Sequence, residues 1–307
     1  MQTPKGTQKK SWNWKHLKIK YLEGKCYRDN QPSIVFIHGF GACKEHWRHN
    51  LAELNKSFNV YALDLVGFGE SEKPRSRLKD EKAIESLFCY GIAEWTSQVI
   101  DFIEQCVTNS EIILVGNSIG GVIASEAARQ IESEGKMARK LILIDCAQRQ
   151  IDDKRLAEQP PFRRLAKPLL KSLVRQRWIT RALYKSLARP GIIKKILTIA
   201  YPSGSNVDDD LVNVLYSATQ DINADEAFRG FINLFDDLLA PDILKQLKTP
   251  TYLIWGEKDP WEPVDEAKKW SSYSCVQQID ILENLGHCPH DENPELVNNL
   301  IFSLTKN

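Results

Sequence analysis

A serine with the sequence context of an enzymatic nucleophile occurs near the middle of the chain. Ser118 lies in the run Gly116-Asn117-Ser118-Ile119-Gly120-Gly121, a G-x-S-x-G pattern that follows the apolar residues 112–115 and precedes a small-residue helical pattern. In this strand–turn–helix context, a strained turn projects the serine hydroxyl above a sheet, and larger side chains at the flanking glycines would meet neighbouring backbone. Such a hydroxyl attacks a carbonyl carbon when a base accepts its proton. The motif therefore predicts acyl-transfer chemistry at Ser118.

A carboxylate and an imidazole that would complete this chemistry lie in two later turns. Asp259 belongs to the turn Gly256-Glu257-Lys258-Asp259-Pro260, and His287 follows Gly286 after the last apolar segment. The chain order is Ser, Asp, His, and the separations of 141 and 28 residues exclude local pairing. Only a fold that gathers the ends of several strands can bring these side chains together.

A glycine-bearing loop near the N-terminus adds a third element of acyl-transfer chemistry. The run His38-Gly39-Phe40-Gly41-Ala42 follows the apolar residues 33–37. Such a loop can turn a backbone N–H toward the serine, and together with the N–H of the residue after the nucleophile it makes an oxyanion hole. A plain strand-to-helix turn is the alternative interpretation.

Six short apolar segments have the character of buried parallel strands that would position these residues. They are residues 33–37, 60–65, 112–115, 141–144, 252–255 and 276–282. Helical patterns separate several of them, and this alternation predicts a mostly parallel, doubly wound α/β sheet. The alternation stops after Asp145 and resumes near Thr249. We therefore predict a core of residues 1–147 and 248–307, with residues 148–247 as an inserted helical cap, or lid.

Together these motifs resemble the α/β-hydrolase superfamily over nearly the whole chain outside the insertion. A further motif of that likeness is the turn Asp64-Leu65-Val66-Gly67-Phe68-Gly69-Glu70-Ser71. The resemblance implies that Ser118 is the nucleophile, that His287 is the general base and then acid, and that Asp259 orients the imidazole. It also implies that Phe40 and Ile119 supply the oxyanion-hole N–H groups, and that neither a metal nor an organic cofactor is needed.

A narrower likeness concerns the substrate. The runs at residues 38–48 and 64–69 are similar to the pheophytinase-like branch of plants and cyanobacteria, whose members remove phytol from a chlorophyll derivative. The resemblance implies a serine hydrolase that cleaves a carboxylic ester of a bulky apolar substrate, a phytol ester among the candidates, through an acyl-enzyme. The elbow is also similar to hydrolases that cleave carbon–carbon bonds of aromatic ring-fission products. That reaction, and a non-catalytic ligand-binding role, remain alternatives.

Several other residues compete for the same roles. Asp145 ends a strand and is an alternative triad acid, although Asp259 has the matching turn. We interpret His290 as a loop histidine and His38 as a hydrogen-bonding support of its turn. We expect Cys288 to pack rather than react. The serine at the elbow argues against the epoxide-hydrolase and haloalkane-dehalogenase branches, which use a carboxylate there.

The insertion has an unusual distribution of charge. Residues 160–200 contain eleven Lys or Arg and no acid, whereas residues 205–241 contain eight acids and one arginine. Apolar residues recur at helical spacing in the basic segment: Phe162, Leu165, Ala166, Leu169, Leu170, Leu173 and Val174. One interpretation is a lid helix whose apolar face covers the active site and whose basic face is solvated or pairs with the acidic stretch. The other is a peripheral membrane-surface helix that collects a lipophilic ester. Nucleic acid is disfavoured by the pI of 7.6.

The composition is that of an ordinary globular protein. The 307 residues are 42% hydrophobic and 26% charged, with a net charge of +1. No apolar run approaches the roughly 18 residues of a membrane span, and the N-terminus has no signal-peptide pattern. The seven dispersed cysteines predict reduced thiols, and His46 with His49 lacks further ligands for a metal. We expect a cytoplasmic protein, with peripheral membrane contact left open.

Overall fold

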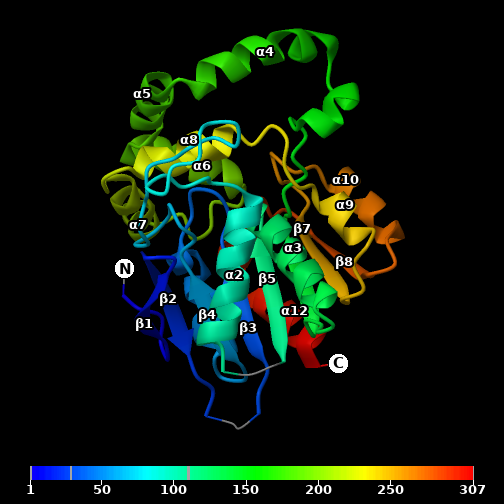
Figure 1. Ribbon diagram of the computed structural model, residues 1–307. Coiled ribbons are helices and arrows are strands. Elements are labelled where there is room, and N and C mark those ends of the chain that lie inside the picture. The colour runs from blue at the N-terminus through cyan, green and yellow to red at the C-terminus, as the bar shows by residue number, and fades with distance from the viewer. Residues whose placement is uncertain (1, 28–29, 109–110, 307) are drawn as a thin grey trace.

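The computed structural model describes residues 2–27, 30–108 and 111–306. At its centre is an eight-stranded sheet in the order β1-β2-β4-β3-β5-β6-β7-β8, shown in Figure 1. The strands are β1 (Gln8–Trp14), β2 (Leu17–Gly24), β3 (Ser33–Ile37), β4 (Asn59–Leu63), β5 (Ile112–Asn117), β6 (Lys140–Ile144), β7 (Thr251–Gly256) and β8 (Val276–Leu282). The adjacent strands in the part β4-β3-β5-β6-β7-β8 pair in parallel. Strand β2 pairs in antiparallel fashion with both β1 and β4. The predicted mostly parallel sheet is confirmed, and β1 and β2 are additional strands.

Both faces of the sheet are covered by helices. Alternate residues of β3 point to opposite faces: Val35 and Ile37 belong to one apolar cluster, and Ile34 and Phe36 belong to the other. The first cluster includes residues of α2 (Ile92–Cys106) and α3 (Ile119–Ser133). The second includes residues of α1 (Arg48–Leu54) and α12 (Pro294–Lys306). Burial on both faces explains why these strands are nearly all-apolar instead of alternating.

The chain between β6 and β7 is helical and contains no strand. Its helices are η2 (Asp153–Glu158), α4 (Pro161–Arg175), α5 (Arg177–Leu187), α6 (Pro190–Ala200), α7 (Asp209–Thr219), α8 (Ala224–Ile232) and α9 (Ala240–Leu244). Figure 1 shows α4 to α8 beyond the upper end of the sheet, whereas α9 lies beside it and packs with α3 in the core. We call residues 148–247 the cap segment, and its status as a separate domain stays a prediction. None of the described helices is long and apolar enough to cross a bilayer.

Short helices complete the fold around the ends of the strands. They are η1 (Lys44–Trp47), α10 (Val264–Lys269), η3 (Trp270–Ser272) and α11 (Pro289–Glu292). The loops after β3, β5, β6, β7 and β8 all leave the sheet at the end that faces the cap segment, because parallel strands share one carboxyl edge. The residues that the sequence marks for chemistry are therefore brought to one edge.

Candidate active site

Ser118 occupies a strained turn between β5 and α3. Its φ of 55° and ψ of −125° lie outside the regions that non-glycine residues favour. A Cβ at Gly116 would lie 2.3 Å from the Gly120 carbonyl oxygen, and one at Gly120 would lie 2.3 Å from the Ile37 oxygen. Only glycine allows β3, β5 and the start of α3 to approach so closely. The local structure is the turn that the motif predicts.

Asp259 and His287 are hydrogen-bonded to each other. The His287 Nδ1 lies 2.7 Å from the Asp259 Oδ2, and the side chain of Asp259 is fully buried. Asp259 Oδ1 accepts the backbone N–H groups of Trp261 at 2.8 Å and Glu262 at 3.1 Å. The Trp261 ring meets the His287 ring edge to face, with 4.8 Å between centroids. These contacts fix the carboxylate and the imidazole in one relative orientation.

The loop that carries His287 is held from two sides. Asn117 Nδ2 donates to the His287 carbonyl oxygen and to the Ile144 oxygen, each at 3.1 Å. The His287 N–H donates to the Ala200 oxygen at the end of α6, at 2.9 Å. A Cβ at Gly286 would lie 2.2 Å from that same oxygen. Asn117, the residue before Ser118, and the cap segment therefore both position the histidine, a role for Asn117 that sequence reasoning missed.

Asp145 lies close to this pair but does not contact the histidine. Its Oδ1 accepts the Gly256 N–H at 2.9 Å. Burial, together with the nearby charge of Asp259, raises the pKa of Asp145 well above its usual value. The raised pKa favours the neutral form of this carboxyl group. Because Asp145 bonds to backbone at the turn after β7 and not to the histidine, the geometry favours Asp259 as the partner of His287.

The loop after β3 is held against the turn at residues 64–71 by His38 and Asp64. His38 Nδ1 donates to the Gly39 oxygen at 2.7 Å, and Nε2 accepts the Leu65 N–H at 3.1 Å, which confirms its predicted supporting role. Asp64 accepts the N–H groups of Lys44 and Glu70 at 2.7 and 2.8 Å. Neither the Phe40 N–H nor the Ile119 N–H donates to an acceptor among the described residues. These two N–H groups are the donors expected for an oxyanion hole.

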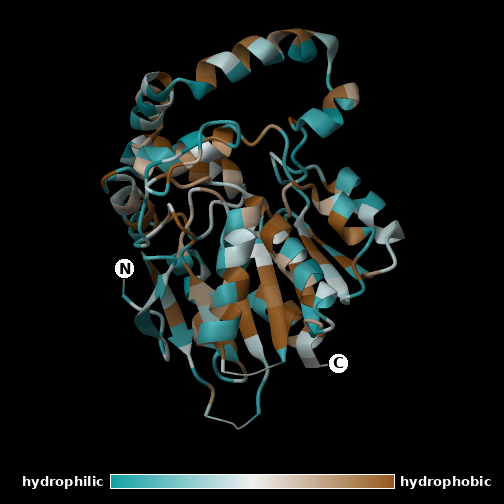
Figure 2. Cartoon of the chain, viewed as in Figure 1, coloured by the Kyte–Doolittle hydropathy of each residue, from teal (hydrophilic) through white to brown (hydrophobic). Residues whose placement is uncertain are grey.

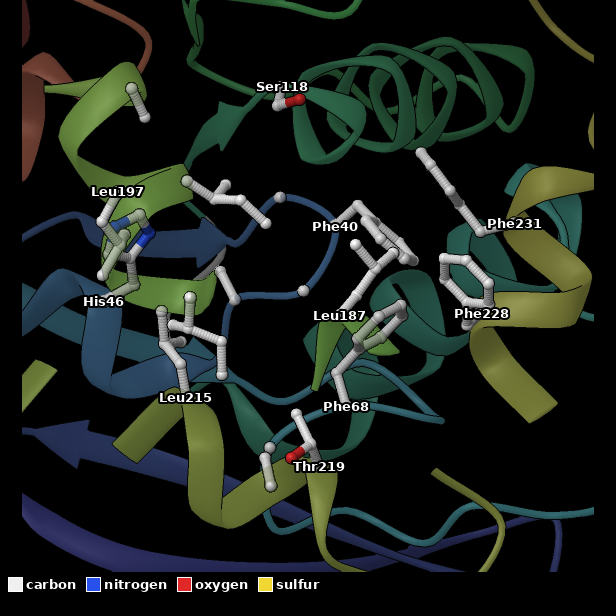
Figure 3. A pocket seen from close by; sticks show the side chains of 18 of the residues that line it. Phe40, His46, Phe68, Ser118, Leu187, Leu197, Leu215, Thr219, Phe228 and Phe231 are labelled. Carbon is white, nitrogen blue, oxygen red and sulfur yellow. The ribbon is translucent and has the colours of Figure 1, made fainter. Parts of the chain in front are cut away.

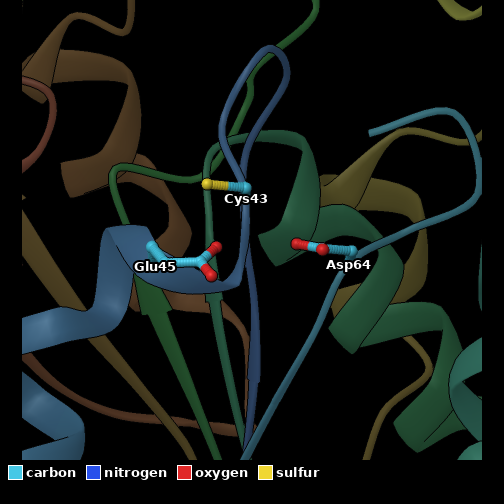
Figure 4. A group of neighbouring side chains, drawn as sticks. All are labelled: Cys43, Glu45 and Asp64. Atoms are coloured by element: carbon cyan, nitrogen blue, oxygen red, sulfur yellow. The ribbon is translucent and has the colours of Figure 1, made fainter. Parts of the chain in front are cut away.

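A buried group of potential metal ligands lies beneath this loop. Figure 4 shows Cys43, Glu45 and Asp64 converging, and among the described residues these are the only such group of three. Lys44 Nζ already lies 2.8 Å from Asp64 Oδ2 and 3.0 Å from Glu45 Oε1, and burial raises the pKa of the Cys43 thiol. The ammonium group thus pairs with both carboxylates, and burial favours the protonated thiol. The group is therefore a buried ion-pair network that shapes the loop.

His46 and His290 belong to a buried network of packed and hydrogen-bonded side chains. His46 Nε2 lies 2.7 Å from the Tyr201 hydroxyl, which donates to Asp291 Oδ2 at 3.0 Å. His290 is buried in α11 against Trp47 and the His46 ring, so its interpretation as a loop histidine is wrong. Buried Asp291 was not anticipated, since only the folded topology places it beside Tyr201. Cys288 is buried, as expected, and burial raises the pKa of its thiol.

An apolar cavity of about 470 Å³ joins Ser118 and His287. Phe40, Phe68, Phe228 and Phe231 gather on one side of it in Figure 3, and Phe40 and Phe231 stack with 3.8 Å between ring centroids. The cap segment contributes residues of α5, α6, α7 and α8 to the lining. Helix α4 contributes none, and its large apolar residues Phe162, Leu165, Leu169, Leu170 and Leu173 are exposed, whereas Val174 is buried. The expectation that this helix covers the active site with its apolar face is therefore wrong.

A strand-end serine, an aspartate-bound histidine and an apolar cavity under inserted helices define a protein of the α/β-hydrolase type. Residues 34–300 match the sequence model of the alpha/beta hydrolase family, so the chain belongs to that family. The match confirms the resemblance inferred from the motifs. The chain is accordingly a hydrolase of the α/β-hydrolase family.

Individual relatives are distant. The chain is 27% identical to an uncharacterized hydrolase, YugF, of Bacillus subtilis over 90% of each protein. It is 24% identical to the chloroplastic pheophytinase of Arabidopsis thaliana, with 94% of this chain and 64% of the relative aligned. Among solved structures, a membrane phospholipase A described as a bacterial virulence factor is 25% identical, with a TM-score of 0.72 over 98% of this chain and 87% of that one.

Proposed function

We propose that the protein is a serine hydrolase that cleaves a carboxylic ester of a bulky apolar substrate through an acyl-enzyme. The observation that carries this proposal is that Ser118 and His287, the imidazole bonded to Asp259, line the same largely apolar cavity. A carbonyl carbon near Ser118 is attacked by its hydroxyl as His287 accepts the proton. The oxyanion is stabilised by the N–H groups of Phe40 and Ile119. His287 then protonates the leaving alcohol, and water repeats the sequence to release the acid.

The lining supports an apolar substrate over an anionic one. Its aromatic and aliphatic side chains come from both the core and the cap segment. Lys73 lines the cavity, but its Nζ already bonds to Asp221 Oδ2 at 2.7 Å and to two carbonyl oxygens. A substrate carboxylate would therefore have to compete with these partners. A long-chain or phytyl ester suits this lining better than a charged ring-fission product.

A comparison of wild type with Ser118→Ala tests the proposal. The substrates are p-nitrophenyl esters of rising acyl length, a phytyl ester of a chlorophyll derivative and a ring-fission product. We expect ester hydrolysis that improves with chain length, and a loss in the variant of at least about 10⁴-fold in kcat. Circular dichroism checks that the variant is folded. Retention of more than a few per cent of wild-type activity by folded Ser118→Ala would contradict the proposal.

Labelling with a fluorophosphonate separates catalysis from mere binding. An activated serine forms a covalent adduct with this reagent, and mass spectrometry locates the adduct. We expect modification at Ser118 in wild type and none in Ser118→Ala. An unlabelled protein that still binds apolar esters would indicate a non-catalytic ligand-binding function.

A further inference from the structure

Helix α4 is oriented with its basic side toward the protein. Lys167 and Lys171 both bond to Asp153, which belongs to η2, and Lys167 Nζ also donates to the Ile151 oxygen at 2.7 Å. Val174, on the same side of the helix, is buried. Residues 167, 171 and 174 share one face because they are four and three positions apart. Lys167 and Lys171 are therefore already paired within the protein.

The opposite face of α4 is apolar and exposed. Phe162, Leu165, Leu169 and Leu173 are spaced by three or four residues and form one stripe. Residues two positions apart are about 200° apart around a helix, so Leu165 and Leu169 point away from the side of Lys167. Leu165 is 83% exposed, and Trp178 at the start of α5 is 72% exposed. Figure 2 shows brown segments along α4 at the outer limit of the molecule. This is the reverse of a surface helix that buries its apolar face.

Helices α5 and α6 carry exposed apolar residues. Leu187 at the end of α5 and Ile196 in α6 line the cavity and are 37% and 39% exposed. Leu183 and Ile199 in the same two helices are also exposed. Exposed apolar side chains therefore occur on helices that form the cavity wall.

Cations without carboxylate partners accompany this apolar surface. In the part of the chain that the structure describes, Arg163, Lys185, Arg189 and Lys195 have no carboxylate oxygen within 4.0 Å. Other cations of the basic stretch do have carboxylate partners in the acidic stretch. Arg177, Arg181 and Lys194 pair with Glu226, Asp225 and Asp209, respectively. The expected pairing between the two stretches is thus realised in part. Arg164 also has no carboxylate partner among the described residues, but it donates to the carbonyl oxygens of Gln159 and Ala157. Four of these five unpaired cations therefore have neither kind of partner in the described part of the chain.

We propose that the exposed stripe of α4, Trp178 and four cations without carboxylate partners form a docking surface for an anionic lipid bilayer. We call the residues Phe162, Arg163, Leu165, Leu169, Leu173, Trp178, Lys185, Arg189 and Lys195 the docking surface. The apolar side chains enter the interfacial region, as in helices that lie in the bilayer plane. Trp178 sits at the headgroup level, and the four cations face the anionic headgroups. The inference rests on the proposed function, because docking would place the enzyme on the membrane that holds an apolar ester.

Sedimentation with vesicles tests the proposal independently of catalysis. Full-length protein carrying Ser118→Ala is mixed with vesicles of phosphatidylcholine alone or of phosphatidylcholine with phosphatidylserine. We expect binding to the mixed vesicles, much weaker binding to the neutral ones, and loss of binding as salt shortens the screening length. Absence of binding to the mixed vesicles at low salt would overturn the docking proposal. It would not bear on the proposed esterase activity, which the hydrolysis assays test separately.

Two variants assign the binding to this surface. Leu165→Ser with Leu169→Ser removes apolar area, and we expect at least about tenfold weaker binding for each leucine. Glu at positions 163, 185, 189 and 195 reverses the four charges, and we expect at least about fivefold weaker binding for each cation, since each contributes about 1 kcal/mol near an anionic surface. The same substitutions are also made in protein that retains Ser118. Its turnover of a small soluble ester should match wild type, because the substituted residues do not line the cavity.

Matched controls use similar residues outside the cap segment. Ile281→Ser with Leu296→Ser changes two exposed apolar residues of β8 and α12, and Lys5→Glu with Lys248→Glu reverses two exposed charges. These variants should bind mixed vesicles as wild type does. Light scattering after gel filtration tests the other occupant, a second copy of the chain. A dimer that Leu165→Ser with Leu169→Ser dissociates, without vesicle binding by either form, would overturn the proposal.

Discussion

Replacing Asp259 and Asp145 separately by asparagine distinguishes the two carboxyl groups near His287. Asp259 accepts hydrogen bonds on both oxygens, from His287 Nδ1 at 2.7 Å and from two backbone N–H groups at 2.8 and 3.1 Å. Asparagine offers one acceptor oxygen and one NH₂ donor. In either orientation of the amide, the NH₂ group faces an N–H donor. The substitution therefore disrupts the tautomer of His287 or the turn that holds the side chain.

The two substitutions should differ by several orders of magnitude in rate. Loss of the orienting carboxylate in a triad costs on the order of 10⁴ in kcat, which corresponds to about 5.5 kcal/mol. Burial and the charge of Asp259 raise the pKa of Asp145 well above its usual value, which favours the neutral form of this carboxyl. Asparagine is neutral, has nearly the same shape and can still accept the Gly256 N–H. For Asp145→Asn we expect a loss below about tenfold.

The measurement is kcat and KM for both variants on one p-nitrophenyl ester at neutral pH. Thermal unfolding is recorded in parallel, so that a loss of activity through unfolding is recognised. A larger loss in Asp145→Asn than in Asp259→Asn, with both variants folded, would refute the reasoning. The orienting acid would then lie at the end of β6.

Two other predictions concern stability and the loop of His287. Burial and the charge of Asp259 raise the pKa of Glu262 from its ordinary 4.5 to about 8 in the folded chain. Between these pH values the folded chain therefore keeps a proton that the unfolded chain loses. Stability should fall as pH rises through that window, and Glu262→Gln should be more stable than wild type near pH 8 but not below pH 4.5, by less than about 5 kcal/mol at about 1.36 kcal/mol per unit. Urea unfolding across the window measures this difference, and a constant difference at all pH values would contradict it. A Cβ at Gly286 would lie 2.2 Å from the Ala200 oxygen, so Gly286→Ala should lower kcat/KM and the melting temperature, whereas Gly191→Ala, in open space within α6, should change neither.

Most of the sheet could be predicted from the sequence because its central strands are buried on both faces. All six predicted segments coincide with β3 to β8 to within two residues at either end. The hairpin of β1 and β2 was missed for two reasons. Strand β1 lies at the sheet edge, is mostly polar and exposed, and buries only Trp14. Strand β2 is mostly buried, but lysines interrupt its apolar residues, so it lacks the apolar run of the central strands. Alternation of tryptophan and polar residues at positions 11–14 was the available signal.

The candidate site was predictable where a local motif carries a backbone requirement. Ser118 is marked by glycines that the elbow geometry needs, and His287 and Asp259 follow strand ends in turn sequences. Asn117 and Glu262 were missed, although both are sequence neighbours of residues that were named. Their roles depend on which distant backbone groups the fold brings to their side chains, such as the His287 oxygen and the Gln148 N–H. No spacing rule in one sequence encodes that information.

The position of His287 depends on the cap segment as well as on the core. Its carbonyl oxygen accepts from Asn117 in the core, and its N–H donates to Ala200 at the end of α6. A displacement of α6 therefore moves the proposed base relative to Ser118. The same helix carries Ile196, which lines the cavity. This coupling is the reason to expect that Gly286→Ala, which forces α6 and the histidine loop apart, reduces kcat and leaves vesicle binding by the docking surface unchanged. If kcat is unchanged while the melting temperature falls, Gly286 serves packing alone and the cap segment does not position the histidine.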